Sequence, residues 1–167
     1  MSHRVLACFL CVLVAAPLVA QTPKYGVTVV ADKDTNFTAL KSYSWEHGWQ
    51  AYDKTVHNQI TTAVDRELTA LGFQKRESGG DVLVTYASLR RIDVDLKSKP
   101  TEGNGGRRQY DVGTLVVLLL QPDSRKELYR ARADKPIEAD PAQTQGLIDG
   151  VVTEMFAKYP TRTAKGK

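Results

Sequence analysis

The sequence predicts an α+β domain in which an antiparallel-dominated, twisted sheet of five to six strands has two helices packed on it. Three observations support this prediction. Several segments are β-branched and apolar or alternate between two faces, which is typical of strands. Two longer segments repeat apolar residues at every third or fourth position, which is typical of helices. The order along the chain is strand, strand, helix, short strand, three strands and helix, which indicates an α+β arrangement.

The first two strands are expected at residues 27–31 and 40–45, and a polar turn over residues 32–36 joins them. The D-x-D-x-N spacing of that turn matches the first ligand positions of a calcium loop. However, Phe37 stands where such a loop needs glycine, and Tyr43 stands where it needs a bidentate glutamate. We therefore predict a solvated turn and no calcium site.

The first helix is expected to begin after Asp53, a good N-cap residue, and to end before Gly72. Its apolar stripe is Val56, Ile60, Val64, Leu68 and Leu71. A short strand should follow near Phe73. The helix therefore has one face to bury against the sheet.

Three further strands are expected at residues 81–97, 110–121 and 126–133. The first places Val82, Val84, Tyr86, Ile92, Val94 and Leu96 on one face. The second is apolar on both faces, which favours a central strand covered on both sides. The third is more polar and reads as an edge strand. The glycine-rich loop at residues 98–108 is predicted to be a flexible hairpin tip.

The second helix should start at Asp140-Pro141, because Asp140 can act as the N-cap and proline lacks the amide that would be unsatisfied at the next position. Gln143 completes a capping box. The apolar stripe is Leu147, Ile148, Val151, Val152, Met155 and Phe156. Tyr159-Pro160 should end the helix.

Residues 1–20 fit a cleaved secretory signal peptide, with Arg4, an apolar stretch and a helix-breaking Pro17 before the expected cleavage site at Gln21. Both cysteines, Cys8 and Cys11, lie in this segment, so their C-x-x-C spacing does not indicate a redox or metal site. We expect a periplasmic or secreted protein without a lipid anchor or a transmembrane span in the mature chain. Residues 21–160 should form the single α+β domain.

The excess of positive over negative charge comes from the two ends of the chain. Of 23 Lys and Arg residues, one lies in the leader and three lie in residues 161–167, which leaves 19 against the 19 Asp and Glu residues of the body. The basic character therefore comes from a tail that we expect to be disordered, and a nucleic-acid partner is not indicated.

Several landmarks occur in a characteristic order and spacing. They are Asn36-Phe37, Leu40, Tyr43-Ser44-Trp45, Leu71-Gly72-Phe73, Asp81-Val82-Leu83-Val84-Thr85-Tyr86, Gly113-Thr114-Leu115-Val116-Val117 and the stretch from Phe156 to Pro160. This set resembles the bacterial domain of unknown function family numbered 4136, over nearly the whole expected mature chain, from about Tyr25 to Pro160. The resemblance implies an exported envelope protein, periplasmic or lipid-anchored. It implies no catalytic residues.

No reactive constellation emerges from the residues. Asp93 and Asp95 form a D-x-D pair, but strand alternation places both on a solvated face. After the leader only His47 and His57 remain as histidines, with no cysteine and no clustered carboxylates beside them, so we predict no metal and no cofactor. No G-x-S-x-G or H-E-x-x-H motif is present.

We therefore expect a non-enzymatic binding or structural domain that contacts an envelope protein or a cell-surface component. The predicted binding residues are Trp45, His47, Trp49, Arg107 and Arg108, because exposed aromatic and arginine side chains are favoured interface anchors. The alternative is a small envelope-polymer hydrolase or transferase that uses surface carboxylates such as Asp93 or Asp95. A third hypothesis is strand addition to the edge at residues 126–133.

Overall fold

The computed structural model describes residues 26–100, 106–137 and 141–163. Its elements are β1 (Gly26–Ala31), β2 (Ser42–Trp45), α1 (Lys54–Ala70), β3 (Gln74–Arg76), β4 (Val82–Val94), β5 (Gln109–Leu120), β6 (Glu127–Pro136), α2 (Pro141–Ala157) and α3 (Pro160–Thr163). The expected signal peptide, the tip of the glycine-rich loop and the Asp140 N-cap lie outside the described residues.

The six strands form one sheet in the order β1-β6-β5-β4-β2-β3. The pairs β1/β6, β6/β5 and β5/β4 are antiparallel, whereas β2 pairs in parallel with both β3 and β4. The α+β class is confirmed, but the sheet is mixed and not antiparallel-dominated as predicted. The reason is that α1 carries the chain back along the sheet between β2 and β3, and such a crossover joins parallel strands.

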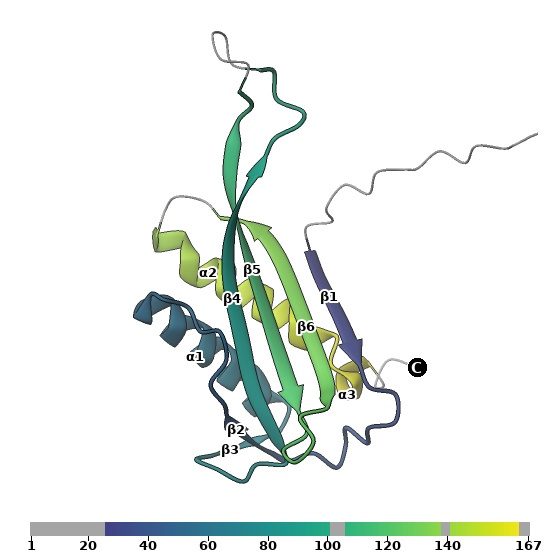
Figure 1. The fold of residues 1–167 in the computed structure, drawn as a ribbon. Helices are drawn as coiled ribbons and strands as arrows, with labels where there is room; N and C mark the ends of the chain where they lie inside the picture. The colour runs from purple at the N-terminus through teal and green to yellow at the C-terminus, as the bar shows by residue number, and fades with distance from the viewer. Residues whose placement is uncertain (1–25, 101–105, 138–140, 164–167) are drawn as a thin grey trace, which may run out of the picture.

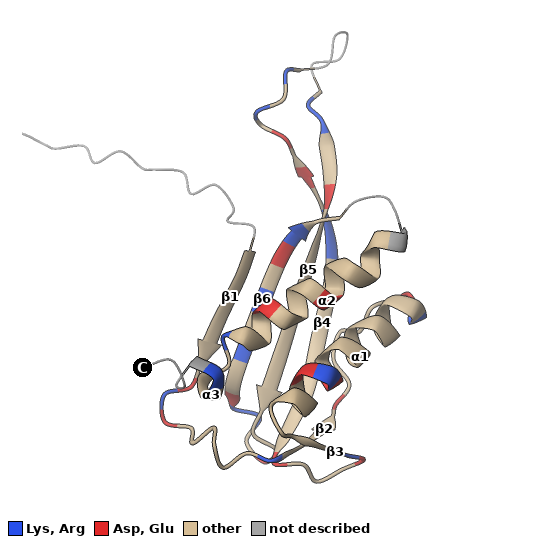
Figure 2. Ribbon diagram, turned by 180° about the vertical axis from the view of Figure 1, so that it is seen from behind, with Lys and Arg blue, Asp and Glu red and all other residues tan. Residues whose placement is uncertain are grey.

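Both long helices cover the same face of the sheet, and the opposite face is open, as Figures 1 and 2 show from the two sides. The predicted helix stripes lie between the layers: Ile60, Val64 and Leu68 of α1 are buried, as are Val152, Met155 and Phe156 of α2. They meet the alternating side chains of the strands, including Val84, Val117 and Ala131. The core therefore has two layers, as the two amphipathic helices predict.

The ends of α1 follow the predicted capping residues. The Asp53 carboxylate accepts the backbone N–H groups of Thr55 and Val56, at 2.7 and 3.1 Å. At the other end, Gly72 has a φ of +89°. The Phe73 N–H donates to the Leu68 carbonyl, and the Gly72 N–H donates to that of Thr69. These two bonds form a Schellman motif, which directs the chain from the helix into β3.

The open face corrects two predictions about β5 and β6. Val116, Leu118 and Leu120 of β5 are half-buried on that face, so β5 is central but is covered by helices on one side only. Strand β6 is an interior strand between β1 and β5, not an edge. Its polar residues Arg130 and Arg132 reflect the uncovered face, and no edge is available there for strand addition.

Strands β4 and β5 continue beyond the helices as a two-stranded arm, which we define as residues 92–98 and 106–111 (Figure 1). The predicted apolar face of β4 is therefore buried only at its beginning. Val84 is 0% exposed, whereas Ile92 and Leu96 on the same face are 65% and 74% exposed. Alternation alone did not reveal where the helical layer ends.

The residues that directly follow Pro160 are part of a short helix, α3. The expected disordered tail at residues 161–167 begins inside α3, and the Arg162 guanidinium lies 3.0 Å from the carboxylate of buried Glu67. Glu67 also accepts the Thr153 hydroxyl at 2.8 Å. A carboxylate of α1 thus ties α2 and α3 to the first helix.

Candidate functional site

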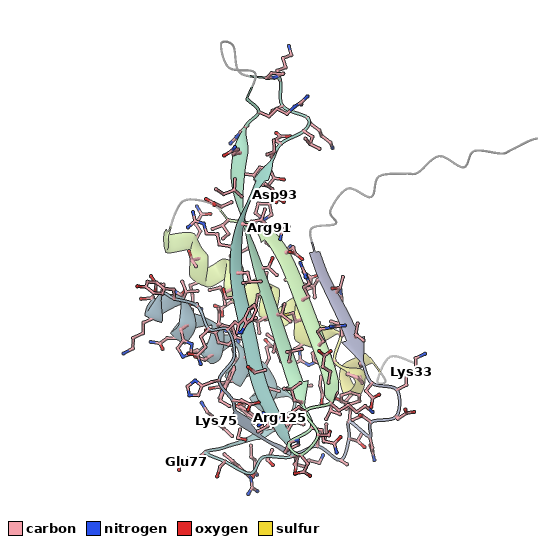
Figure 3. All side chains as sticks on the ribbon, viewed as in Figure 1. Lys33, Lys75, Glu77, Arg91, Asp93 and Arg125 are labelled. Atoms are coloured by element: carbon pink, nitrogen blue, oxygen red, sulfur yellow. The ribbon has the colours of Figure 1, made fainter. Side chains whose placement is uncertain are left out.

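A depression of ≈ 290 Å³ lies where the end of β2, the following loop, α1 and β3 meet. Its lining residues are Trp45, Glu46, His47, Gln50, His57, Thr61 and Lys75. They come from segments up to thirty residues apart in the chain, which the β2-α1-β3 crossover brings together. Figure 3 places Lys75 at the β3 end of the molecule, away from the arm.

Asp65 of α1 organises the wall of this depression. One carboxylate oxygen accepts the Tyr43 hydroxyl at 2.6 Å and the Trp45 indole N–H at 2.8 Å. The other accepts the Lys75 ammonium at 2.7 Å. Burial, followed by the bond to the Asp65 carboxylate, holds the pKa of the Tyr43 hydroxyl above its usual range. The phenol therefore remains a donor, and Asp65 fixes β2 and β3 against α1.

A second group of bonds joins α1, β4 and the loop. Nδ1 of His57 lies 2.7 Å from the hydroxyl oxygen of Tyr86, and that oxygen accepts the Ala51 backbone N–H at 3.1 Å. The imidazole stacks on the Tyr86 ring, and the Trp45 ring packs edge-on against the same Tyr86 ring. Burial raises the pKa of the Tyr86 hydroxyl. The tautomer of His57 decides the direction of this bond: the phenol donates when Nδ1 is unprotonated, and Nδ1–H donates to the phenolic oxygen when it is protonated.

The loop that forms the rim follows β4 closely. The Glu46 N–H donates to the Val84 carbonyl at 2.8 Å, and the Ser88 N–H donates to the Trp49 carbonyl at 2.9 Å. Between these bonds the backbone at Gly48 passes so close to β4 that a Cβ there would lie 2.2 Å from Thr85 Oγ1 and 2.5 Å from the Tyr86 carbonyl oxygen. Only glycine fits at this position.

The charged groups of the depression already have partners. Lys75 pairs with Asp65, and Glu46 pairs with Arg125 of the turn before β6. The remaining hydrogen-bonding groups are the Thr61 hydroxyl, the two imidazoles and the Gln50 amide, which lies 3.2 Å from Nδ1 of His47. The site thus presents hydrogen-bonding groups and an aromatic wall without a large net charge.

The structure divides the predicted binding residues between two places. Trp45 and His47 line the depression, and Trp49 is 76% exposed on its rim loop. Arg107 and Arg108 lie in the arm, where the Arg107 guanidinium donates to the Leu96 and Ser98 carbonyls. The Trp49 carbonyl meets β4 at Ser88, whereas the Arg108 carbonyl meets the chain at Asp95. Seven residues of strand separate these points by about 23 Å, so the predicted surface is not continuous.

Asp93 and Asp95 do not line the depression. Asp93 lies beside Arg91 where the arm begins (Figure 3), with the guanidinium Nε 3.0 Å from its carboxylate. Arg91 also donates to Asp134, at 2.7 Å. Asp95 accepts the Lys97 and Ser98 N–H groups and thus caps a turn. The contacts of these two carboxylates hold the backbone and neighbouring side chains in place, and neither carboxylate belongs to the depression.

Asp134 is the centre of this charged cluster on the open face. Its carboxylate accepts hydrogen bonds from the side chains of Arg132, Thr114 and Arg91. The bond from Arg132, followed by those from Thr114 and Arg91, holds the pKa of the Asp134 carboxyl well below its usual range. The cluster joins β4, β5 and β6 at the level where the arm leaves the body of the sheet.

Over the described residues, no three His, Cys, Asp or Glu side chains are grouped so that they could hold a metal ion. Within the same part of the chain, every helix is too short or too polar to cross a membrane. In the turn after β1, whose D-x-D-x-N spacing was noted above, the Asp32 carboxylate accepts the Thr35 hydroxyl and the Lys126 ammonium.

Sequence reasoning missed Asp65, Tyr86, Gln50, Thr61 and Lys75. Tyr86 carried a usable signal, because a phenol in a buried strand row needs a hydrogen-bond partner. Asp65 adjoins the apolar stripe of α1 and could have been noted as a carboxylate facing the sheet. Lys75 and Gln50 carried no local signal, since their positions depend on how β3 and the rim loop pack.

Comparison with known proteins bears on the family and the fold. The model of the family described as Domain of unknown function (DUF4136) matches residues 27–161, and no curated protein matches the chain. A solved PDZ domain protein from Parabacteroides distasonis ATCC 8503 has 12% identity and a TM-score of 0.57, over 81% of this chain and 35% of that chain. This chain therefore spans only about a third of that protein, and the likeness shows a shared fold.

Two further solved structures resemble the chain more distantly. The PelC dodecamer from Paraburkholderia phytofirmans has 11% identity and a TM-score of 0.48, over 81% of this chain and 99% of that one. A minor lipoprotein from Acinetobacter baumannii has 14% identity and a TM-score of 0.46, over 74% and 93% of the two chains.

Proposed function

This chain belongs to the family Domain of unknown function (DUF4136), and we propose that it is an exported cell-envelope protein that binds an uncharged, hydroxyl-rich component of the cell surface, such as a neutral glycan. The observation that carries the proposal is the depression beside α1. It combines an aromatic wall with neutral hydrogen-bonding groups, while its charged groups are already paired.

The absence of a free charge argues for a neutral ligand. Among the described residues that line the depression, the ammonium of Lys75 is held by Asp65 and the carboxylate of Glu46 by Arg125. An anionic ligand would compete with Asp65 for the Lys75 ammonium, and a cationic one would compete with Arg125 for the Glu46 carboxylate. Because each competition weakens a formed ion pair, a neutral ligand binds at lower cost.

The remaining groups favour a ligand with many hydroxyls. The Thr61 hydroxyl, the Gln50 amide and the two imidazoles each donate and accept hydrogen bonds, and a hydroxyl does the same. The wall is formed by Trp45, whose indole N–H is already used by Asp65. Trp49 and Tyr52 on the same loop are largely exposed and extend the apolar surface outside the depression.

Export is supported by residues 1–20, whose basic start, apolar stretch and Pro17 fit a secretory signal. We propose cleavage before Gln21, with no lipid attached. Mass spectrometry of the protein recovered from the cell envelope or the medium should find Gln21 as its first residue. An intact Met1, or an added acyl mass, would contradict this part of the proposal.

Intrinsic tryptophan fluorescence tests the binding proposal, because the chain has two tryptophans and both belong to the site region. Titration with neutral oligosaccharides should change the emission, and anionic oligosaccharides of the same length should bind more weakly. Gln50→Ala should weaken the response about tenfold, which corresponds to ~1.4 kcal/mol. Gln121→Ala, an exposed amide elsewhere, is the matched control. An emission that no neutral sugar changes, or an unaltered response in Gln50→Ala, would reject the proposal.

A further inference from the structure

The outer edge of β4 is open where the arm begins. On this side β2 pairs with residues 82–84 only, and the Trp49 carbonyl takes the Ser88 N–H. Beyond Ser88, no described strand lies against that edge. An edge strand with unpaired N–H and C=O groups is a template on which another chain can pair.

The direction of the backbone groups along this edge follows from three observed bonds. The Val84 carbonyl and the Ser88 N–H both point away from β5, toward β2 and the rim loop. The Asp95 N–H points toward β5, where it donates to the Arg108 carbonyl. Pairing with β5 continues without a register shift from Leu83 to Val94, so the even-numbered residues present their backbone groups to the open edge.

Arg90, Ile92 and Val94 are therefore the residues whose backbone groups face outward. Ile92 and Val94 also expose 65% and 44% of their surface, and both lie on the face that the helices cover in the body of the molecule. A two-stranded ribbon is marginally stable in water, and it gains stability when further strands extend it. The arm thus has both an apolar row and a free backbone edge.

We propose that the occupant of this edge is a second copy of the same chain, which pairs antiparallel through β4 about a two-fold axis at Ile92. In this register Ile92 lies opposite Ile92 of the second copy. Arg91 of each copy lies opposite Asp93 of the other, so the interface contains two such pairs. Opposite charges across antiparallel strands stabilise a pair, whereas like charges destabilise it. The interface is isologous, as a two-fold dimer requires.

Other positions of the two-fold axis near Ile92 place like charges opposite each other or mismatch the backbone hydrogen bonds. An axis at Arg90 or at Arg91 sets that arginine against itself, and an axis at Asp93 sets two aspartates together. An axis at Val94 places Asp93 opposite Asp95. An axis between two residues pairs outward-facing groups with inward-facing ones, because residues directly opposite in an antiparallel pair must both face each other or both face away. The Ile92 axis alone among these satisfies both the hydrogen bonds and the charges.

Light scattering or sedimentation of the purified chain from dilute to millimolar concentration tests the proposal. We expect a mass that rises from one chain to two. Ile92→Lys places two ammonium groups at the axis and should raise the dissociation constant at least about tenfold. Val30→Lys replaces an exposed valine on the other edge strand, β1, and is the matched control. A one-chain mass throughout, association unchanged by Ile92→Lys, or association lost in Val30→Lys would overturn it.

Amide exchange measured by NMR at low and high concentration provides a second readout that needs no variant. The N–H groups of Arg90, Ile92 and Val94 should exchange more slowly in the concentrated sample. Val29 of β1 serves as an internal control. The Val27 carbonyl accepts the Lys158 ammonium and therefore points away from β6. Val29 is two residues further along the strand, so its N–H points the same way, toward the outer edge of β1. Unchanged exchange at the three arm amides, or slowing at Val29 instead, would contradict pairing through β4.

Discussion

The hydroxyl of Tyr86 holds the imidazole of His57 and the backbone of the rim loop at once. Nδ1 of His57 lies 2.7 Å from the phenolic oxygen, and the Ala51 N–H donates to the same oxygen at 3.1 Å. Tyr86 is 2% exposed, and its two partners, Ala51 and His57, are half-buried. One buried oxygen of β4 therefore positions parts of α1 and of the loop that form the depression.

Tyr86→Phe removes this oxygen and keeps the ring. We expect a loss of about 1 to 2 kcal/mol in the free energy of unfolding, because the Ala51 N–H and the His57 Nδ1 lose their partner. Urea denaturation measures the loss. Tyr52→Phe, at a fully exposed ring, is the matched control and should leave stability unchanged. Equal stabilities of Tyr86→Phe and the parent would show that the loop is held by other contacts.

Asp65→Ala should weaken the attachment of β2 and β3 to α1. The buried Tyr43 hydroxyl and the Trp45 indole lose their acceptor, which is expected to cost about 2 to 3 kcal/mol. Thermal or urea unfolding checks the value. Asp65→Asn retains one acceptor oxygen and should lose less. Asp123→Ala, at an exposed turn residue, is the control, and a loss no greater than in that control would contradict the proposed role of Asp65.

Stability should fall in acid through Asp134. Its carboxyl has a pKa that is lower in the folded chain than the ordinary ~3.9 of an unfolded aspartate. The stabilisation is therefore fully present above that value and is lost as the pH falls below ~4 toward the folded pKa, because the unfolded state then binds more protons. Asp134→Asn should flatten this part of the stability curve and cost about 1 to 2 kcal/mol at neutral pH. An identical acid profile in the variant would locate the acid sensitivity elsewhere.

Gly48→Ala and Gly150→Ala should have opposite effects. A Cβ at Gly48 would collide with Thr85 and with the Tyr86 carbonyl, so the rim loop must move, at a cost of about 1 to 3 kcal/mol. A Cβ at Gly150, in α2, meets nothing within 4 Å and replaces a poor helix former, so stability should rise by about 0.5 to 1 kcal/mol. Denaturation of both variants decides the matter, and a stable Gly48→Ala protein with an unaltered sugar response would refute the close approach.

Arg162→Ala should destabilise the chain by about 1 to 3 kcal/mol, because it removes the nearer of two cations beside the buried carboxylate of Glu67 and leaves the Arg66 guanidinium, at 3.7 Å, as the remaining partner. Urea denaturation measures the effect. The control is Arg130→Ala on the open face, whose guanidinium lies 3.5 Å from half-exposed Glu127. Similar small losses in both variants would mean that α3 does not support the helix pair.

The helices and most strands could be predicted because their signals are local. Asp53 and Gly72 mark the ends of α1, and the stripe through Ile60 and Val64 identifies its buried face. The pairing of β2 in parallel could not be predicted, since it depends on which strands meet after the α1 crossover. The polarity of β6 was attributed to an edge, although it comes from the uncovered face of the sheet.

The site was predictable only in part for the same reason. Trp45 and His47 were recognised as aromatic and polar residues close together in one segment. Asp65 and Lys75 join them through the packing of α1 and β3, and Tyr86 through the pairing of β4, which no local pattern contains. The two arginines at residues 107 and 108 were grouped with this surface because the length of the β4–β5 arm was not apparent.

NMR shift mapping with a neutral oligosaccharide shows whether the depression beside α1 binds a neutral, hydroxyl-rich ligand. We expect saturable shifts at Gln50, His57 and Thr61, and none at Arg107 or Asp93 of the arm. Shifts confined to the arm or the open face, or no saturable shifts with any neutral sugar, would contradict binding in the depression.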